Sequence, residues 1–496
     1  MSDNKINRAS NCLGNKGLLL LFGEVMAMAL VGAFSSTHFS FVDSASIVIA
    51  FAIAYLVPRF IYSGSKESCR WGQWTLLLAA TALAFYAICE FIAWTPVGGF
   101  SLEMPYLTDD SEDYYRWALS HYDGRFPSPD IIYTGLPIIM LGLWKIFGVN
   151  VVWPMALNIM CILLTMVITG KIAIRLLSHR FPLTNPANIA ASAMLMVALL
   201  GFFVAQGMRI QKESYCSLGF TMVAYAFVGM SVPTLSKREK RRDLLMFLTG
   251  TFIVAFIRTN FVYFIFVGAV MMSLANKCAQ WKRGALMAAV ALSFTFLFNF
   301  LFNYTIEHQL LILEGGKIVA NDFELGKTQQ PYQNIIGDYY FYPQWKRVLM
   351  LPVTMGVQYI IPFPWIYDYS NATIMTIMIH VRFMWYFVGG ICLFYYLYLT
   401  VARSKKFSLG MWALWPVLIF VFLSFATGGL VSRYFLPIQP MFVVIALYVM
   451  LLIKAGHCRR AFTIGMVIYL IVLFATFYFC YYTHVGFLRS NNLINS

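Results

Sequence analysis

The chain has 496 residues, of which 60% are apolar and only 11% are charged, and its mean hydropathy is +0.71. This composition excludes a soluble globular protein and predicts a polytopic membrane protein. The formal net charge of +15 does not point to nucleic acid, because the basic residues collect in short loops between apolar runs.

Apolar runs of about 20 residues, enough for a helix to cross about 30 Å of hydrocarbon, recur along nearly the whole chain. A β-barrel would show shorter alternating segments instead, so we expect an all-α fold. Fourteen runs are present: 17–35, 44–63, 73–98, 131–147, 151–175, 188–206, 213–233, 244–257, 261–276, 284–304, 375–402, 408–428, 434–453 and 461–482. The run at 131–147 contains Gly135, Pro137 and Lys145, and we expect it to lie along the membrane surface. About 13 transmembrane helices remain.

Lysine and arginine collect in loops that stay in the cytoplasm, so their distribution predicts the orientation of the chain. With a cytoplasmic N-terminus, the inner segments hold 23 of the 36 Lys and Arg residues but only four of the 21 acidic residues. Two large extracytoplasmic loops with short surface helices follow. The predicted parts are N-terminal spans (1–98), a first outer loop (99–150), central spans (151–304), a second outer loop (305–373) and C-terminal spans (374–496).

The first outer loop contains an unusually acidic stretch, LTDDSEDYYRWA at 107–118. It holds four carboxylates within five positions: Asp109, Asp110, Glu112 and Asp113. One interpretation is a solvated helix start, with Asp110 or Ser111 as the cap of a helix that begins near Glu112. The other is a catalytic base. A divalent cation, though not assigned, is a third alternative, for which the available ligands are Asp113, Asp123 and Asp130.

Several cations occur near the outer ends of the predicted spans: Arg209 and Lys212 beside Glu213, then Arg258, Arg382 and Arg433. The runs on either side of Arg258 have 14 and 16 residues, which places this arginine below the membrane surface. A charge at helix centre costs about 2.5–3.5 kcal/mol, so a retained one usually faces a partner or a polar cavity. Because a guanidinium donates paired hydrogen bonds to phosphate, these residues indicate a lipid-phosphate site. The alternatives are snorkelling to headgroups and a local ion pair of Arg209 with Glu213.

These residues occur in the order found in a known family. In the first loop and after it come Asp110, Tyr114, Ala118, Gly124-Arg125-Phe126, Pro137, Phe147-Gly148 and a span closing at Arg175. Then follow Arg209 with Glu213, Arg258, and Arg433-Tyr434 with Pro437 and Pro440. The order resembles that of the GT-C membrane glycosyltransferases, above all the protein O-mannosyltransferase and aminoarabinose transferase branch. The resemblance covers about residues 100–280 and 425–455.

The resemblance implies an inverting transferase that moves a sugar from a polyprenyl phosphate to an acceptor hydroxyl. Its active site would face outward from a bacterial inner membrane, and its acceptor would be a lipid, glycan or protein of the cell envelope. Asp110 is implied as the general base, with Asp109 as the competing candidate. The implied substrate- and phosphate-binding residues are Arg209, Glu213, Arg258, Arg433, Tyr114 and Tyr434.

Two other classes of membrane protein fit parts of the pattern. A lipid-linked oligosaccharide flippase or another transporter would spread its charges through the depth of the membrane, whereas here they cluster on the outer side. An O-antigen-type polymerase would place its working residues in the late loop, 305–373. The sequence contains no C-x-x-C pair and no nucleotide-binding glycine loop, so we expect no thiolate metal site and no soluble nucleotide cofactor.

Overall fold

The computed structural model describes residues 41–65, 68–94, 110–124, 135–200, 210–230, 235–275, 281–301, 343–360, 384–392, 408–427, 432–456 and 459–490. Helices and short turns make up all of these residues, and none of them lies in a strand. The predicted all-α class is therefore confirmed. The predicted first span at 17–35 lies outside the described residues.

Most of the helices coincide with apolar runs of the sequence, whereas α4 and α15 lie in the two predicted outer loops. The N-terminal half contains α2 (Phe41–Ser63), α3 (Arg70–Trp94), α4 (Asp110–Tyr122), α5 (Gly135–Phe147), α6 (Val152–Leu177), α7 (Pro186–Ala198) and α9 (Glu213–Met230). The rest contains α10 (Lys237–Arg258), η1 (Thr259–Phe261), α11 (Val262–Ala275), α12 (Trp281–Leu301), α15 (Gln344–Ile360), α18 (Ser408–Thr427), η5 (Ser432–Ile438), α19 (Gln439–Lys454) and α20 (Arg459–Ser490). Of the run predicted at 375–402, only the helical residues 384–392 are described.

Within the described part of the chain, six helical stretches are long and apolar enough to cross a membrane. They are Ala45–Ser63, Arg70–Ile88, Val152–Leu177, Lys237–Leu274, Trp281–Leu301 and Tyr434–Lys454. The protein is thus an integral membrane protein, and the count of 13 spans stays a prediction. Helix α5 has 13 residues and a length of about 20 Å, and the expectation that it lies along the membrane surface stays a prediction.

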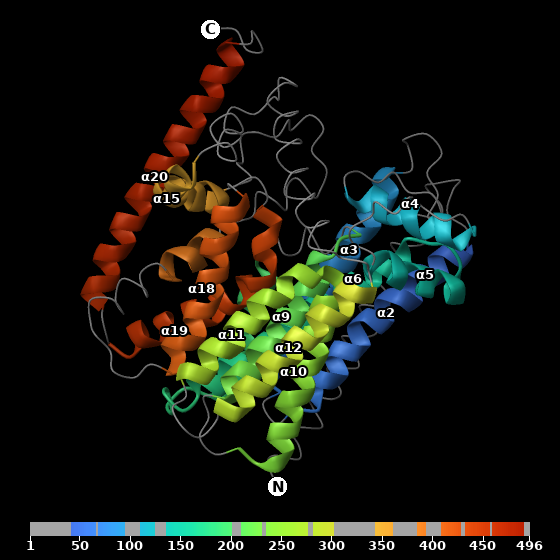
Figure 1. Cartoon of the computed structure of the whole chain (residues 1–496), viewed down its shortest axis with the longest axis horizontal. Helices are drawn as coiled ribbons and strands as arrows, with labels where there is room; N and C mark the ends of the chain where they lie inside the picture. The colour runs from blue at the N-terminus through green and yellow to red at the C-terminus, as the bar shows by residue number, and fades with distance from the viewer. Residues whose placement is uncertain are drawn as a thin grey trace.

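The central helices run alternately between two ends of the bundle. At one end, here called the basic end, Arg175 of α6 and Arg283 of α12 contact Asp243 of α10 at 2.8 and 3.2 Å. At the opposite end, the site end, Arg258 closes α10 and lies 3.9 Å from Glu213, which opens α9. Helices α9 to α12 lie side by side between these ends (Figure 1).

The long stretch Lys237–Leu274 is not one straight helix. Arg258 has φ −155° and ψ 80°, far from helical values, and η1 follows it. Beyond this break α11 returns toward the basic end, because Gly284 at the start of α12 packs on both Ser273 and Met230. The structure therefore contains the predicted turn at Arg258, but only α11, with 14 residues, is short; α10 has 22 residues because it extends into the basic segment that starts at Lys237.

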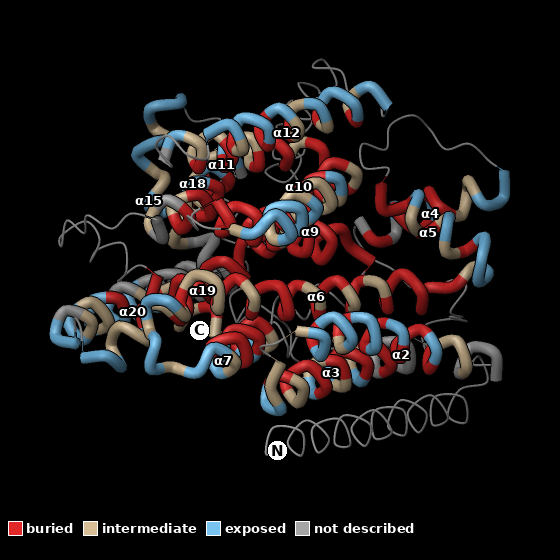
Figure 2. The backbone as a smooth tube through the Cα atoms, turned by 90° about the horizontal axis from the view of Figure 1, so that it is seen from below, coloured by how far each residue is buried: buried red, intermediate tan, exposed pale blue. Residues whose placement is uncertain are grey.

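The core of the bundle is built around α6 and α9. Figure 2 shows α6 buried along most of its length, and every residue of α9 except Met222 is buried. The outer helices instead expose large apolar side chains, among them Phe300 of α12 and Phe474 of α20. Such surfaces suit contact with lipid, since a soluble monomer rarely exposes large apolar patches.

Candidate functional site

The acidic stretch of the first outer loop forms the start of α4. The helix begins at Asp110, so the prediction of a start near Glu112 was wrong by two residues. The hydroxyl of Ser111 is buried and has no hydrogen-bond partner among the described residues, so it does not cap the helix as the capping interpretation allowed. Asp109 and the side chain of Asp110 lie outside what the structure describes.

Aromatic contacts hold α4 and α5 against the start of α6. The Tyr115 ring meets the buried Trp144 ring edge-on, with 5.0 Å between centroids. The Trp144 indole N–H donates to the Asn150 carbonyl at 2.8 Å, and the Asn150 side chain accepts from the Val152 amide at 2.6 Å. These bonds satisfy polar groups that would otherwise be buried without partners, and they fix the pair of surface helices at the site end.

Helix α5 also touches the last turn of α10, beside Arg258. A Cβ atom placed on Gly135 would collide with the carbonyl oxygen of Phe256. Only glycine permits this close approach of two backbones, because any side chain would push α5 away from α10. This contact brings α5, and with it the acidic helix α4, next to the buried Arg258.

Gly135→Ala is expected to lower the free energy of unfolding by about 1–3 kcal/mol, because the Phe256 backbone cannot move aside freely. The measurement is thermal unfolding of the purified protein in detergent. Gly142→Ala is the matched control in the same helix, since a Cβ there meets no atom within 4 Å. It should be neutral or slightly stabilising. Equal melting temperatures for the two variants would contradict the close contact.

A buried charged cluster lies at the site end, and it consists of Tyr114, Lys212, Glu213 and Arg258. The Lys212 ammonium donates to the Tyr114 hydroxyl at 2.7 Å, which links α4 to the start of α9. The Arg258 Nη1 atom lies 3.9 Å from Glu213 Oε1. All four residues are 7% exposed or less. The cluster therefore joins the acidic helix to the cations that the sequence placed far apart.

Arg258 is held between two aromatic rings. Its guanidinium carbon lies 4.2 Å from the centroid of Phe261 and 4.2 Å from that of Tyr434. Both contacts have cation–π geometry, which favours a charged guanidinium over a neutral side chain at this position. Tyr434 belongs to η5, so the late Arg-Tyr motif meets the cluster through its tyrosine. Arg433 is part of η5, but its side chain is not described.

The electrostatics of the cluster favour an anion. Its described members comprise two cations and one carboxylate, a net charge of +1 in a buried position. Next to Lys212, the Gln211 side chain is buried, and its carbonyl oxygen has no hydrogen-bond partner among the described residues. Guanidinium and ammonium groups are side chains that proteins use to bind phosphate, so the cluster contains suitable donors for one.

The structure brings together four of the eight site residues that the sequence predicts: Tyr114, Glu213, Arg258 and Tyr434. Arg209 lies outside the described residues, as does Arg382. Because Arg209 is not described, the alternative of a local ion pair between Arg209 and Glu213 is not tested; Glu213 lies 3.9 Å from Arg258. Lys212 was named among the cations of the expected lipid-phosphate site but not among the residues that the family resemblance implies, and Phe261, three residues beyond Arg258, was not predicted at all.

The metal alternative is not tested, because Asp130, one of its three ligands, is not described. Asp113 and Asp123 are both exposed, and Asp130 lies outside the described residues. Within the described ranges, no group of three His, Cys, Asp or Glu side chains is placed to hold a metal ion. By contrast, the cations Lys212 and Arg258 of the cluster at the site end are both buried.

Comparison with known proteins gives structural similarities only. No protein-family model matches the sequence, and a search of curated proteins found no match. The crystal structure of the apo oligosaccharyltransferase from Archaeoglobus fulgidus is 15% identical with a TM-score of 0.44, and the alignment covers 84% of this chain and 56% of that one. The archaeal oligosaccharyltransferase AglB from the same organism, in complex with an inhibitory peptide and a dolichol-phosphate, is 14% identical with a TM-score of 0.42 over 83% and 55%.

This chain thus spans little more than half the length of those enzymes. Identity and TM-score at this level carry no conclusion about activity, so the function proposed below rests on the residues of this chain.

Proposed function

We propose that the protein is an integral-membrane glycosyltransferase that moves a sugar from a polyprenyl-phosphate donor to an acceptor hydroxyl on the extracytoplasmic side. The observation that carries the proposal is the hydrogen bond between Lys212 and Tyr114. It attaches the acid-bearing helix α4 to the buried Lys212–Glu213–Arg258 cluster. A base and a phosphate site would therefore be neighbours, as a displacement at a sugar phosphate requires.

The base of the proposed reaction is Asp110. Helix periodicity supports this choice, because Asp110 precedes Tyr114 by four positions and residues at that spacing share a face of a helix. A carboxylate there would accept the proton of the acceptor hydroxyl as its oxygen attacks the anomeric carbon. Asp109, the preceding residue, is the alternative base.

The leaving group of the proposed reaction is the lipid phosphate. As the new carbon–oxygen bond forms, the bond from the anomeric carbon to the phosphate oxygen breaks, and that oxygen retains the electron pair. Fixed cations stabilise such charge best when they are already in place before the reaction. Arg258, clamped between Phe261 and Tyr434, and the buried Lys212 meet this requirement. A single displacement inverts the configuration of the sugar; Arg209 and Arg433 are proposed as further phosphate ligands.

The proposal is tested with full-length protein purified in detergent and reconstituted into vesicles. A panel of radiolabelled polyprenyl-phosphate sugars is supplied with membrane extracts as a source of lipid, glycan and protein acceptors. The expected result is release of polyprenyl phosphate together with labelled product. Movement of intact labelled donor across the vesicle membrane without cleavage would instead identify a flippase and refute the transferase. Growth of a repeating glycan on the lipid carrier would identify a polymerase.

A further inference from the structure

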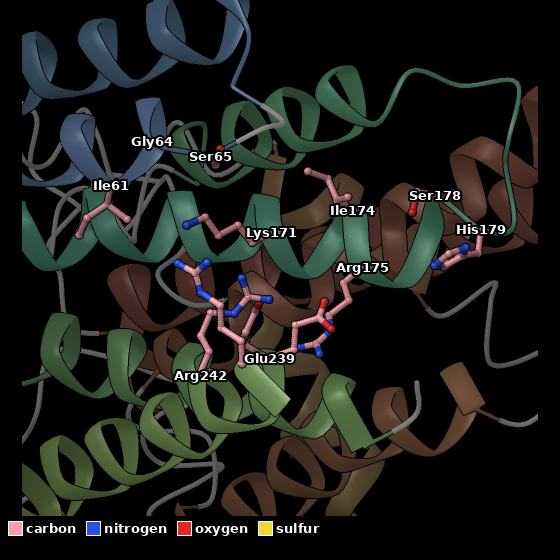
Figure 3. A pocket seen from close by; sticks show the side chains of 12 residues that line it. Ile61, Gly64, Ser65, Lys171, Ile174, Arg175, Ser178, His179, Glu239 and Arg242 are labelled. Carbon is pink, nitrogen blue, oxygen red and sulfur yellow. The ribbon is translucent and has the colours of Figure 1, made fainter. Parts of the chain in front are cut away.

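A cavity lined by charged side chains lies at the basic end, away from the cluster at the site end. The cavity has a volume of about 810 Å³ and lies between the last turns of α2 and α6 and the first turns of α10. Its charged and titratable lining residues are Lys171, Arg175, His179, Arg238, Glu239 and Arg242. With His179 neutral the lining carries a net charge of +3. Figure 3 shows Lys171, Arg175 and Arg242 directed into the space between α6 and α10.

Two of these cations are fixed around one aromatic ring. The guanidinium carbons of Arg175 and Arg242 lie 4.9 and 5.5 Å from the centroid of Tyr225, which also lines the cavity. Like charges held this near each other repel unless an anion lies between them. The Asp243 carboxylate offsets the charge of Arg175, but the lining and Asp243 together still carry +2 with His179 neutral, which suits a bound anion.

Arg175 has a rigid support behind it. Its guanidinium makes two hydrogen bonds, of 2.8 and 3.0 Å, to the fully buried carboxylate of Asp243. A Cβ on Gly229 would collide with that carboxylate, so α9 leaves room for it by having glycine there. A two-point bond of this kind sets the plane of the guanidinium, which pre-organises its remaining N–H groups for a ligand.

Glu239, the one acidic residue that lines the cavity, is hydrogen-bonded to the start of α10 and does not pair with the cations of the lining. Glu239 Oε2 accepts hydrogen bonds from the Ser236 amide at 2.9 Å and the Ser236 hydroxyl at 2.8 Å. This capping box ties the carboxylate to the start of α10. Neither Arg238 nor Arg242 makes an ion pair with any residue that the structure describes.

We propose that this cavity binds the phosphate of an anionic membrane lipid. Phosphate is recognised by clustered guanidinium groups, and basic pockets between transmembrane helices on the cytoplasmic side bind anionic headgroups. A lipid is favoured over a soluble phosphate because exposed apolar side chains adjoin the opening. Phe60 is 81% exposed, and Ile61, itself a lining residue, is 40% exposed. They offer a surface for the apolar tails. The proposal does not depend on transferase activity.

The test measures lipid binding to the full-length protein by native mass spectrometry in a neutral detergent at about 0.15 M salt, where distant charges are screened. Phosphatidylglycerol is titrated against phosphatidylcholine, which has no net charge. We expect phosphatidylglycerol to bind at least tenfold more tightly. Arg242→Gln should weaken it by about tenfold, as loss of a charge-assisted hydrogen bond does.

Arg241→Gln is the matched control, because Arg241 is the exposed neighbour of Arg242 and does not line the cavity. It should change the affinity by less than about twofold, since a screened charge contributes little. Arg242 is exposed as well, so both variants should unfold at the wild-type temperature. Equal weakening by the two substitutions, or equal binding of the two lipids, would overturn the proposal. Displacement of the lipid by inorganic phosphate at similar concentration would reassign the cavity to a soluble anion.

Discussion

Asp110→Asn is expected to lower the rate of sugar transfer by a factor of about 10²–10⁴, the usual contribution of a general base. Asparagine keeps the size and helix-start preference of aspartate but cannot accept the hydroxyl proton, so folding should be preserved. The measurement is single-turnover transfer from a polyprenyl-phosphate sugar, with donor binding determined separately. The loss should appear in the rate of transfer and leave donor affinity nearly unchanged.

The same helix supplies the control for this experiment. Asp113 is exposed and lies three residues further along α4, so Asp113→Asn removes an equal charge without touching the proposed site. It should leave the transfer rate within about twofold, in line with the small effects of surface substitutions. If Asp109→Asn abolishes transfer while Asp110→Asn does not, Asp109 is the base. Wild-type activity in both Asp109→Asn and Asp110→Asn would show that neither carboxylate is the general base, and the proposed mechanism would fail.

Arg258→Gln is expected to have two separate effects. It leaves the carboxylate of Glu213 buried without its counter-charge, which should destabilise the protein by about 3–5 kcal/mol. It also removes a cation from the proposed phosphate site, which should lower transfer by about 10²–10³. Thermal unfolding and the transfer assay measure the two effects on the same samples.

The double variant Arg258→Gln/Glu213→Gln separates structure from chemistry. Removing both charges should restore most of the stability, because the Glu213 carboxylate is no longer left buried without the Arg258 guanidinium. Transfer should stay low, since the phosphate ligand is still missing. Should the double variant regain both stability and activity, Arg258 would be only the structural partner of Glu213, and the phosphate site would have to lie elsewhere.

The helices could be predicted closely from apolar length, but their detailed ends could not. The run at 151–175 became α6 at Val152–Leu177, and that at 213–233 became α9 at Glu213–Met230. Membrane-spanning helices can be predicted because crossing the hydrocarbon layer requires a run of about 20 apolar residues. The start of α4 depends instead on local competition between polar side chains, which composition does not resolve. Helix α15 lies within the second outer loop, where the sequence indicated short surface helices without bounds.

Part of the site was accessible from sequence because buried charges are rare. Arg258 and Glu213 stood out against apolar surroundings, and the order of motifs pointed to Tyr114 and Tyr434. The bond between Lys212 and Tyr114 and the ring contact of Phe261 with Arg258 arise from tertiary packing. The cavity at the basic end was missed for another reason. Its lysine and arginine residues were interpreted only as the cytoplasmic positive charge that sets the orientation of the chain, so no binding site was inferred from them.

Helix α10 has a consequence for the surrounding bilayer. Its buried charges, Asp243 and Arg258, are 15 residues apart, which corresponds to about 22 Å along the axis. A hydrocarbon layer of about 30 Å exceeds that span, and such hydrophobic mismatch is relieved by local compression of the lipids. The acyl chains next to α10 are therefore expected to be shortened or disordered. A bilayer of shorter acyl chains is therefore expected to match this helix with less deformation than one of longer chains.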